Sequence, residues 1–124
     1  MFLFSAIIIT GGSTTRTVEI LRSNGSYWCS LPDLPDLRFQ HTQSGLITCG
    51  GGGDSNDTET SCLSFSDGQW STSHQLQHSG CYHSSWMSQH GVVLMGGSTS
   101  QNLTEILNDN GGSTASFTLE NNRL

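Results

Sequence analysis

The most informative part of this 124-residue chain is residues 37–51, LRFQHTQSGLITCGG. It predicts a polar first arm of a hairpin, a turn at Gly45, a short apolar strand over residues 46–49, and a glycine pair, Gly50 and Gly51, that ends the strand. Glycine suits such a stop because it adopts positive φ angles without a steric penalty. The local prediction is therefore a β-hairpin.

The same pattern returns on both sides of this stretch. Residues 83–97 read HSSWMSQHGVVLMGG, and residues 7–12, IIITGG, supply its second half alone. The glycine pairs begin at residues 11, 50 and 96, so the units are 39 and 46 residues apart. A unit of this length made of short strands is typical of a β-propeller blade. The apolar residues 1–9 lack a basic leading segment, and we interpret them as a core strand and not as a signal peptide.

Turn signals and composition also favour strands. Ser, Thr, Gly and Asn are abundant and Lys is absent, a balance that disfavours helices. Asn24-Gly25 and Asp67-Gly68 predict tight turns, and each leads to a tryptophan, Trp28 or Trp70. The connector 29–36 contains two prolines, which cannot sit inside a strand ladder, so we expect it to cross the surface between two units.

Together these elements resemble the kelch repeat. The resemblance rests on the apolar strand ending in Gly-Gly, a strand carrying Glu19 or Glu105, an aromatic residue followed by tryptophan, and the Arg38-x-x-His41-Thr42 segment that opens the second unit. It covers nearly the whole chain. Two departures stand in the third unit, where Gly80 occupies the place of Arg38 and Phe117 replaces the tryptophan.

The resemblance implies an all-β chain, a kelch-type β-propeller fragment of about two and a half four-stranded blades in an incomplete ring. We expect residues 1–36 to form a blade that lacks its first strand, residues 37–78 a second blade and residues 79–124 a third. Propellers have about four to eight blades. We therefore expect the chain to be a fragment; the alternative is a chain that completes itself by assembly.

Most residues that recur between units are expected to support the framework. The apolar residues predicted to pack between blades are Ile7, Ile9, Leu46, Val92 and Leu94. Trp28 and Trp70 should lie between blades too, each with its indole N–H bonded to a backbone carbonyl. Arg38, Glu19 and Glu105 are expected to form partly buried ion pairs or to bond backbone groups at strand ends. The remaining structural repeat residues are the histidines His41 and His83 and the glycines Gly11, Gly12, Gly50, Gly51, Gly96 and Gly97.

The cysteines and the glycosylation sequons favour an extracellular or secreted protein. Cys49 and Cys62 fall on neighbouring strands of a meander and are the first choice for a disulfide bond, which leaves Cys29 and Cys81 as candidates for pairing beyond this chain. The alternative is a cytoplasmic protein with four reduced cysteines. The sequons, which predict a glycoprotein, are Asn24, Asn56 and Asn102, all in expected turns or loops.

Charge and motif content exclude several functions. The formal net charge of −6 disfavours nucleic acid, and we expect no membrane insertion, no metal site and no cofactor. The chain is therefore expected to be a non-enzymatic protein-binding module that presents loops 54–59, 71–79 and 98–102 to a partner protein. The alternatives are part of a galactose-oxidase-like copper radical oxidase, for which Tyr27, Tyr82 and Cys81 offer a poor fit, and a purely structural repeat segment.

Overall fold

The chain folds into three antiparallel sheets, each built from strands that are consecutive in the sequence. The structure is a computed structural model that describes residues 6–22, 25, 27–52, 59–78, 84–89, 91–96 and 103–118, with side chains described up to residue 114. The described residues form strands and turns and contain no helix. The prediction of an all-β chain is confirmed.

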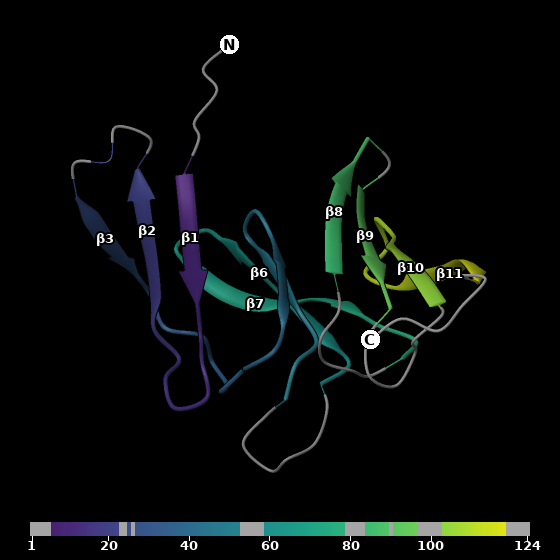
Figure 1. Ribbon diagram of the computed structural model, residues 1–124, viewed down its shortest axis with the longest axis horizontal. Coiled ribbons are helices and arrows are strands. Elements are labelled where there is room, and N and C mark those ends of the chain that lie inside the picture. Colours follow the sequence, from purple (N-terminus) through teal and green to yellow (C-terminus); the bar gives the residue numbers. More distant parts are fainter. Residues whose placement is uncertain are drawn as a thin grey trace.

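Each sheet is a simple meander (Figure 1). The first has three strands: β1 (Ala6–Thr10), β2 (Val18–Arg22) and β3 (Trp28–Leu31). The second has four strands: β4 (Thr42–Ser44), β5 (Ile47–Cys49), β6 (Ser61–Ser66) and β7 (Gln69–Gln75). The third also has four strands: β8 (Ser84–Ser88), β9 (Gly91–Met95), β10 (Leu103–Leu107) and β11 (Ser113–Thr118). The first sheet thus has no described counterpart of β4 and β8, which we call the first strands of their sheets.

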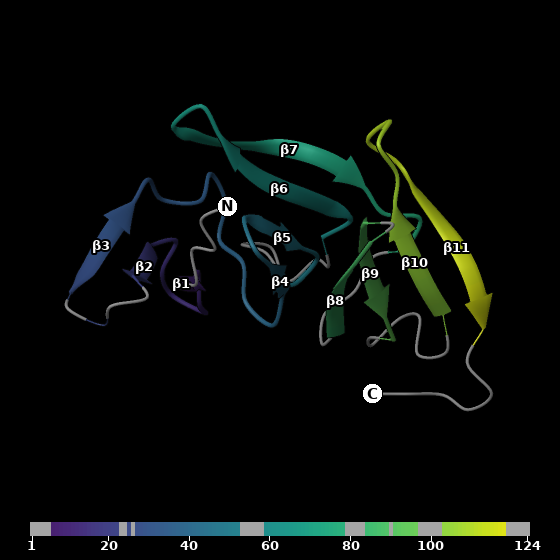
Figure 2. The same ribbon diagram turned by 90° about the horizontal axis from the view of Figure 1, so that it is seen from above.

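The three sheets radiate from a common side of the molecule. Figure 2 shows β1, β4 and β8 nearest that side, whereas β3, β7 and β11 lie on the outside of an arc. The apolar runs of β5 and β9 belong to two different sheets, as a repeat of separate units requires. Figure 1 shows that β1 and β9, which hold equivalent places in their units, run in the same direction.

The glycine pairs end strands in the way that the sequence predicts. The first glycine of each pair has a positive φ, 62° at Gly11, 64° at Gly50 and 70° at Gly96. Its N–H donates to the carbonyl at the start of the next strand, and the three acceptors are Thr17, Ser61 and Leu103 at 3.0, 3.1 and 2.9 Å. The same backbone bond therefore recurs in all three units. At Gly11 a Cβ would lie only 2.6 Å from the Arg38 carbonyl oxygen, so the site also requires a residue without a side chain.

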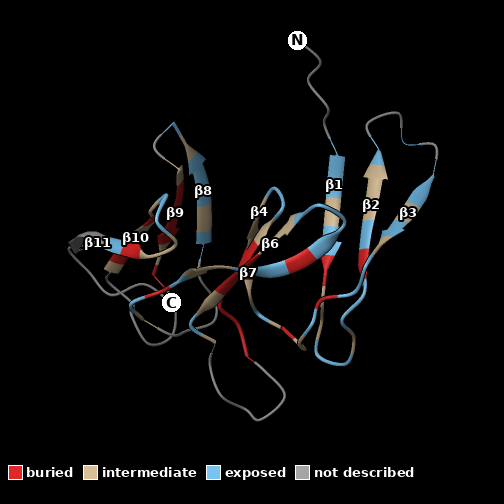
Figure 3. Cartoon of the chain, turned by 180° about the vertical axis from the view of Figure 1, so that it is seen from behind, coloured by how far each residue is buried: buried red, intermediate tan, exposed pale blue. Residues whose placement is uncertain are grey.

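Alternate side chains of the strands pack against the neighbouring sheets. Between the first and second sheets lie Val18, Leu34, Leu63 and Trp70, with Ile8, Leu31 and Phe65 against them. Between the second and third sheets lie Cys49, Cys62, Leu76, Val92, Leu94 and Leu107, with Ile47 against them. Figure 3 shows the buried residues concentrated around the second sheet, while the strands of the first sheet are largely exposed. The second sheet is therefore covered on both faces.

Several predicted core residues are exposed, which corrects the sequence analysis. Ile7 and Ile9 are 58% and 50% exposed because they lie on the face of the first sheet that points away from the second. Trp28 lies opposite Leu21 on the same face and is also exposed. Leu46 belongs to the turn before β5 and is exposed as well. Val92 and Leu94, in contrast, are buried as predicted.

The connector after the first sheet also differs from its prediction. Strand β3 continues to Leu31, through residues that the sequence analysis placed in the connector. The predicted loop 71–79 is wrong in the same way for residues 71–75, which belong to β7. Leu34 is buried between the first two sheets, so the connector is anchored in the core and is not a simple surface crossing. Its N–H donates to the Arg16 carbonyl, and the N–H of Leu76 in the next connector donates to the Thr60 carbonyl in the same manner. A buried leucine therefore anchors both connectors.

Candidate functional site

Arg38 is a completely buried cation at the start of the second unit. Its Nε donates to Asp36 Oδ1 at 2.8 Å and its Nη2 to Asp36 Oδ2 at 3.1 Å, a two-point ion pair. Its Nη1 donates to the carbonyls of Gly50 and Ser61 at 3.3 and 2.7 Å. These carbonyls lie at the end of β5 and the start of β6. The guanidinium therefore holds a strand end in place, as predicted, and has no free donor edge for a substrate.

Glu105 plays a comparable role between the second and third sheets. Its carboxylate accepts the backbone N–H groups of Gln77 and His78, both at 3.0 Å, and it also accepts the Ser113 hydroxyl. His78 Nδ1 lies 2.9 Å from the same carboxylate. Glu105 is buried on β10, whereas Gln77 and His78 belong to the connector after β7. The side chain therefore fastens this connector to the third sheet, which confirms its predicted bonding to backbone groups. Glu19, on the outward face of the first sheet, is exposed.

His41 links the first and second sheets through a chain of hydrogen bonds. The Thr10 hydroxyl donates to Gln43 Oε1, and it lies 2.8 Å from His41 Nε2. Since a hydroxyl has one proton, Nε2 must be the donor in the second bond. Nδ1 is then the bare nitrogen, and it is buried without a hydrogen-bond partner among the described residues. This arrangement agrees with the predicted structural role of His41.

The surroundings of His41 disfavour its protonation. Burial lowers the pKa of this imidazole, and the charge of Arg38 lowers that pKa further, while nearby backbone oxygens of Arg38 and Thr10 favour protonation and are outweighed. A group with a lowered pKa in the folded state stabilises the fold fully above its unfolded pKa, here about 6.5. Stability is then lost as the pH falls below that value.

We expect the His41→Gln variant to lose less stability than the wild type when the pH is lowered from 7.5 to 5.5. The amide can still donate to Thr10 but does not titrate in this range. The measurement is the free energy of unfolding from urea titrations at both values of pH. His74→Gln serves as the control, since this change leaves His41 in place and should preserve the steeper pH dependence. Identical pH dependence of wild type and His41→Gln would contradict the assignment.

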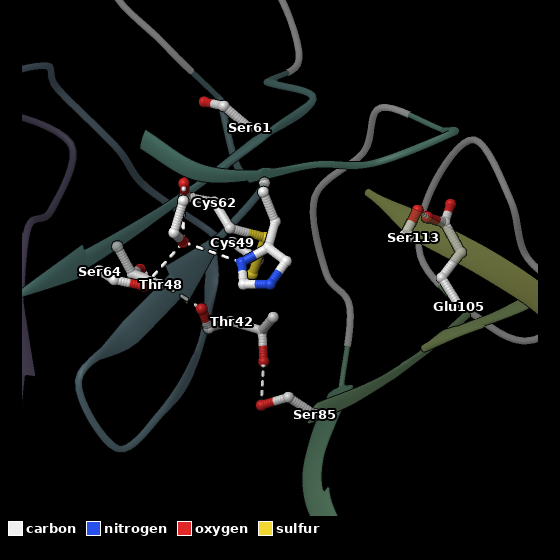
Figure 4. Close-up of a disulfide and its surroundings, with 12 residues drawn as sticks. Thr42, Thr48, Cys49, Ser61, Cys62, Ser64, Ser85, Glu105 and Ser113 are labelled. Carbon is white, nitrogen blue, oxygen red and sulfur yellow. Dashed lines mark hydrogen bonds between the residues drawn. A yellow bond between two sulfur atoms is a disulfide. The ribbon is translucent and has the colours of Figure 1, made fainter. Parts of the chain in front are cut away.

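Hydroxyl groups join the first strands of the second and third sheets. The Thr42 hydroxyl on β4 donates to the Ser85 hydroxyl on β8 at 2.7 Å (Figure 4). The Ser85 hydroxyl donates to the Gln43 carbonyl at 3.0 Å. Thr42 is buried there. The two first strands therefore lie side by side on the inner side of the arc, connected by short polar side chains.

Cys49 and Cys62 form the predicted disulfide bond. They are paired residues of β5 and β6, with their Cα atoms 4.1 Å apart. Because Gly50 and Leu46 make the backbone bonds to β6, Cys49 and Cys62 form a non-hydrogen-bonded pair, which is the closer kind. Figure 4 shows the disulfide in the second sheet. Cys29 is a free, half-buried thiol, and Cys81 lies outside the described residues.

The two tryptophans have different environments. Trp70 is buried, donates its indole N–H to the Pro32 carbonyl at 2.9 Å and packs against Phe65. The predicted burial of Trp70 between two sheets and its bond to a backbone carbonyl are confirmed. Trp28 is 48% exposed, which contradicts its predicted place between blades. Its face of the first sheet meets no other described sheet.

Several predicted positions lie outside the described residues. They are His83, Gly97, the sequons Asn24, Asn56 and Asn102, and most of the loops 54–59 and 98–102. Their predicted roles stay predictions. The described part of the chain contains no group of three or more His, Cys, Asp or Glu side chains that could hold a metal ion. Among the same residues there is no helix of the length and apolar character that crossing a membrane requires.

Comparisons with known proteins supply no further assignment. No protein-family model matches the chain, and a search of curated proteins finds no significant match.

Sequence reasoning missed four residues that complete these contacts. Asp36 was assigned only to the connector 29–36, and His78 only to the loop 71–79, although each pairs with a residue singled out from the repeat. Leu34 and Leu76 occupy equivalent places six residues after Trp28 and Trp70. That spacing is a signal that could have identified both as core residues.

Proposed function

We propose that this chain is a segment of about two and a half blades of a kelch-type β-propeller, and that it acts as a non-enzymatic, extracellular protein-binding module. The observation that carries the proposal is the recurrence of the same contacts in successive sheets. The backbone bond of the first glycine occurs in all three, and a buried connector leucine follows the first two. Sheets that repeat their contacts and radiate from one side are the building principle of a propeller.

The use of the buried charged groups supports binding over catalysis. Arg38 donates its hydrogen bonds to the end of one strand and the start of the next, and Glu105 accepts hydrogen bonds from a connector. His41 bonds Thr10 between two sheets. Polar side chains that hold a scaffold leave recognition to the connections between strands, which can vary without loss of the core.

The disulfide supports the extracellular part of the proposal. Cys49–Cys62 lies in the core between two sheets, and disulfides persist mainly in oxidising compartments. Glycosylation of the three sequons is part of the same proposal, since acceptor sites of secreted proteins lie in surface turns.

The proposed binding surface is the end of the sheets where β1, β5 and β9 finish. The connections that follow these equivalent strands leave the sheets on one side, because β1 and β9 run in the same direction (Figure 1). The described part of this end includes the exposed residues Ser13 and Thr14. The turns at Gly45 and after β6 lie at the opposite ends of their strands.

A binding screen with matched variants tests the proposal. The full chain is immobilised and screened against a panel of extracellular protein domains, and each saturable binder is measured again with two variants. Thr14→Arg alters the proposed surface, and Ser66→Arg makes the same kind of change at an exposed residue at the far end of β6. We expect Thr14→Arg to weaken binding about tenfold or more, as expected for a clash at an interface, and Ser66→Arg to leave it within about twofold. The absence of any saturable binder, or equal sensitivity to both changes, would overturn the proposal.

A further inference from the structure

We propose that the free edge of β1 is a binding site for an extended peptide strand whose side chains resemble those of β4. In the second and third sheets, β5 and β9 are each paired on both sides, with the first strands β4 and β8 on the inner side. β1 occupies the equivalent place in its unit but pairs only with β2 among the described strands. This inference does not depend on the proposed partner-binding end or on extracellular location.

The backbone of β1 presents its free hydrogen-bonding groups in a defined pattern. Gly11 donates its N–H to Thr17 on the β2 side, so the alternation of a strand directs the backbone groups of Ile7 and Ile9 to β2 as well. Those of Ala6, Ile8 and Thr10 then point to the edge that no described strand covers. Thr10 itself is buried, and its backbone oxygen lies near the His41 imidazole. An apolar strand with such an edge and without Lys or Pro is a template for strand addition.

The pairing of β4 with β5 specifies how the added strand would lie. Thr42 pairs with Cys49 and Ser44 with Ile47, and in the repeat Thr10 and Ile8 take the places of Cys49 and Ile47. The incoming strand would therefore run antiparallel to β1. Its residues equivalent to Thr42 and Ser44 would bond the outward groups of Thr10 and Ile8, and the residue equivalent to Gln43 would direct its backbone away from β1.

The contact between β4 and β8 indicates why this strand should carry a small hydroxyl. Thr42 faces the third sheet and bonds Ser85, as Figure 4 shows. By the same repeat, the residue opposite Thr10 in the added strand would face the second sheet, where Gln43 stands in the place of Ser85. Gln43 already bonds Thr10 there. A threonine or serine at that position could bond Gln43, whereas valine, of similar shape, could not.

A peptide of residues 38–46, RFQHTQSGL, is the probe, and its binding to the intact chain is measured by fluorescence anisotropy. N-methylation at the position of Thr42 removes a bond to β1 and places a methyl group at the interface. We expect it to weaken binding about tenfold or more, while N-methylation at the position of Gln43 leaves binding within about twofold. Replacing the same threonine with valine should weaken binding several-fold.

Residue-resolved amide hydrogen exchange locates the bound peptide. We expect slower exchange at Ile8 and Thr10, whose N–H groups face the free edge, and no change at Ile7 and Ile9. Equal binding of the two N-methylated peptides, or no saturable binding of the unmodified peptide, would overturn the inference. Faster exchange at Thr42 and Ser44 would also overturn it, because the peptide would then be replacing β4 in the second sheet. If the binding screen found no protein partner, the peptide results would not change. The proposed function and the peptide-binding inference can therefore be overturned independently of each other.

Discussion

Replacing Arg38 with methionine is expected to lower the free energy of unfolding by about 3 kcal/mol, the lower end of the range for removing one partner of a buried ion pair, because the remaining Asp36 side chain is 38% exposed. The methionine fills a similar volume but donates no hydrogen bond. The carbonyls of Gly50 and Ser61 lose a donor at the point where β5 leads to β6. The Ser61 carbonyl still accepts the Gly50 N–H, whereas the Gly50 carbonyl is left without a donor. An unpartnered buried acceptor costs about 1–3 kcal/mol, so the Gly50 oxygen accounts for much of the expected loss. The measurement is urea unfolding at pH 7.5, followed by tryptophan fluorescence.

Arg16→Met is the matched control for this change. Arg16 is exposed and donates a single bond to the Pro35 carbonyl at 3.1 Å. Its loss should cost about 1 kcal/mol or less. If Arg38→Met lowered the free energy of unfolding no more than Arg16→Met does, the buried guanidinium would not stabilise the second sheet.

Removing the disulfide by the double substitution Cys49→Ala and Cys62→Ala is expected to destabilise the fold by about 3 kcal/mol. The two cysteines are separated by 13 residues in the sequence, and a loop of about 15 residues corresponds to roughly this entropic contribution. The sulfur atoms also fill part of the core against the third sheet, so the loss of packing acts in the same direction. The measurement is again the free energy of unfolding, without reducing agent.

The control for the disulfide is Cys29→Ala. Cys29 is a free thiol on the first sheet, and its replacement should change stability by about 1 kcal/mol or less. Adding reductant to the unfolded wild type before refolding should reproduce the destabilisation of the double variant and should not affect that variant itself. Equal stability of the wild type and the double variant would contradict a structural role for the bond.

The sequence predicted the strands and their order because the signals for them are local. The first glycines of the three pairs end strands through a φ that other residues adopt at a cost, and this is a property of single positions. The Asp67-Gly68 turn and the alternation of side chains along β6 and β9 are equally local. The Cys49–Cys62 pair followed from the meander that these signals imply.

The partners of the recurring polar residues were harder to predict. Arg38 and Glu105 were singled out from the sequence, but their contacts with Ser61 and with Gln77 and His78 join segments 23 to 28 residues apart. Such contacts depend on where a connector crosses the neighbouring sheet. The bond between Thr42 and Ser85 joins two sheets and has no signal within either strand.

Local signals in the amino-acid sequence were enough to predict the repeat, the strands of each unit and the buried pair of cysteines, since turn chemistry and side-chain alternation act over a few residues. Which face of each sheet is covered, in contrast, depends on how the sheets pack against one another. Ile9 and Leu94 hold the same place in their units, yet Ile9 is half exposed and Leu94 is buried. The reason is that burial depends on a neighbouring sheet, and the second sheet covers Leu94 whereas no described sheet covers Ile9.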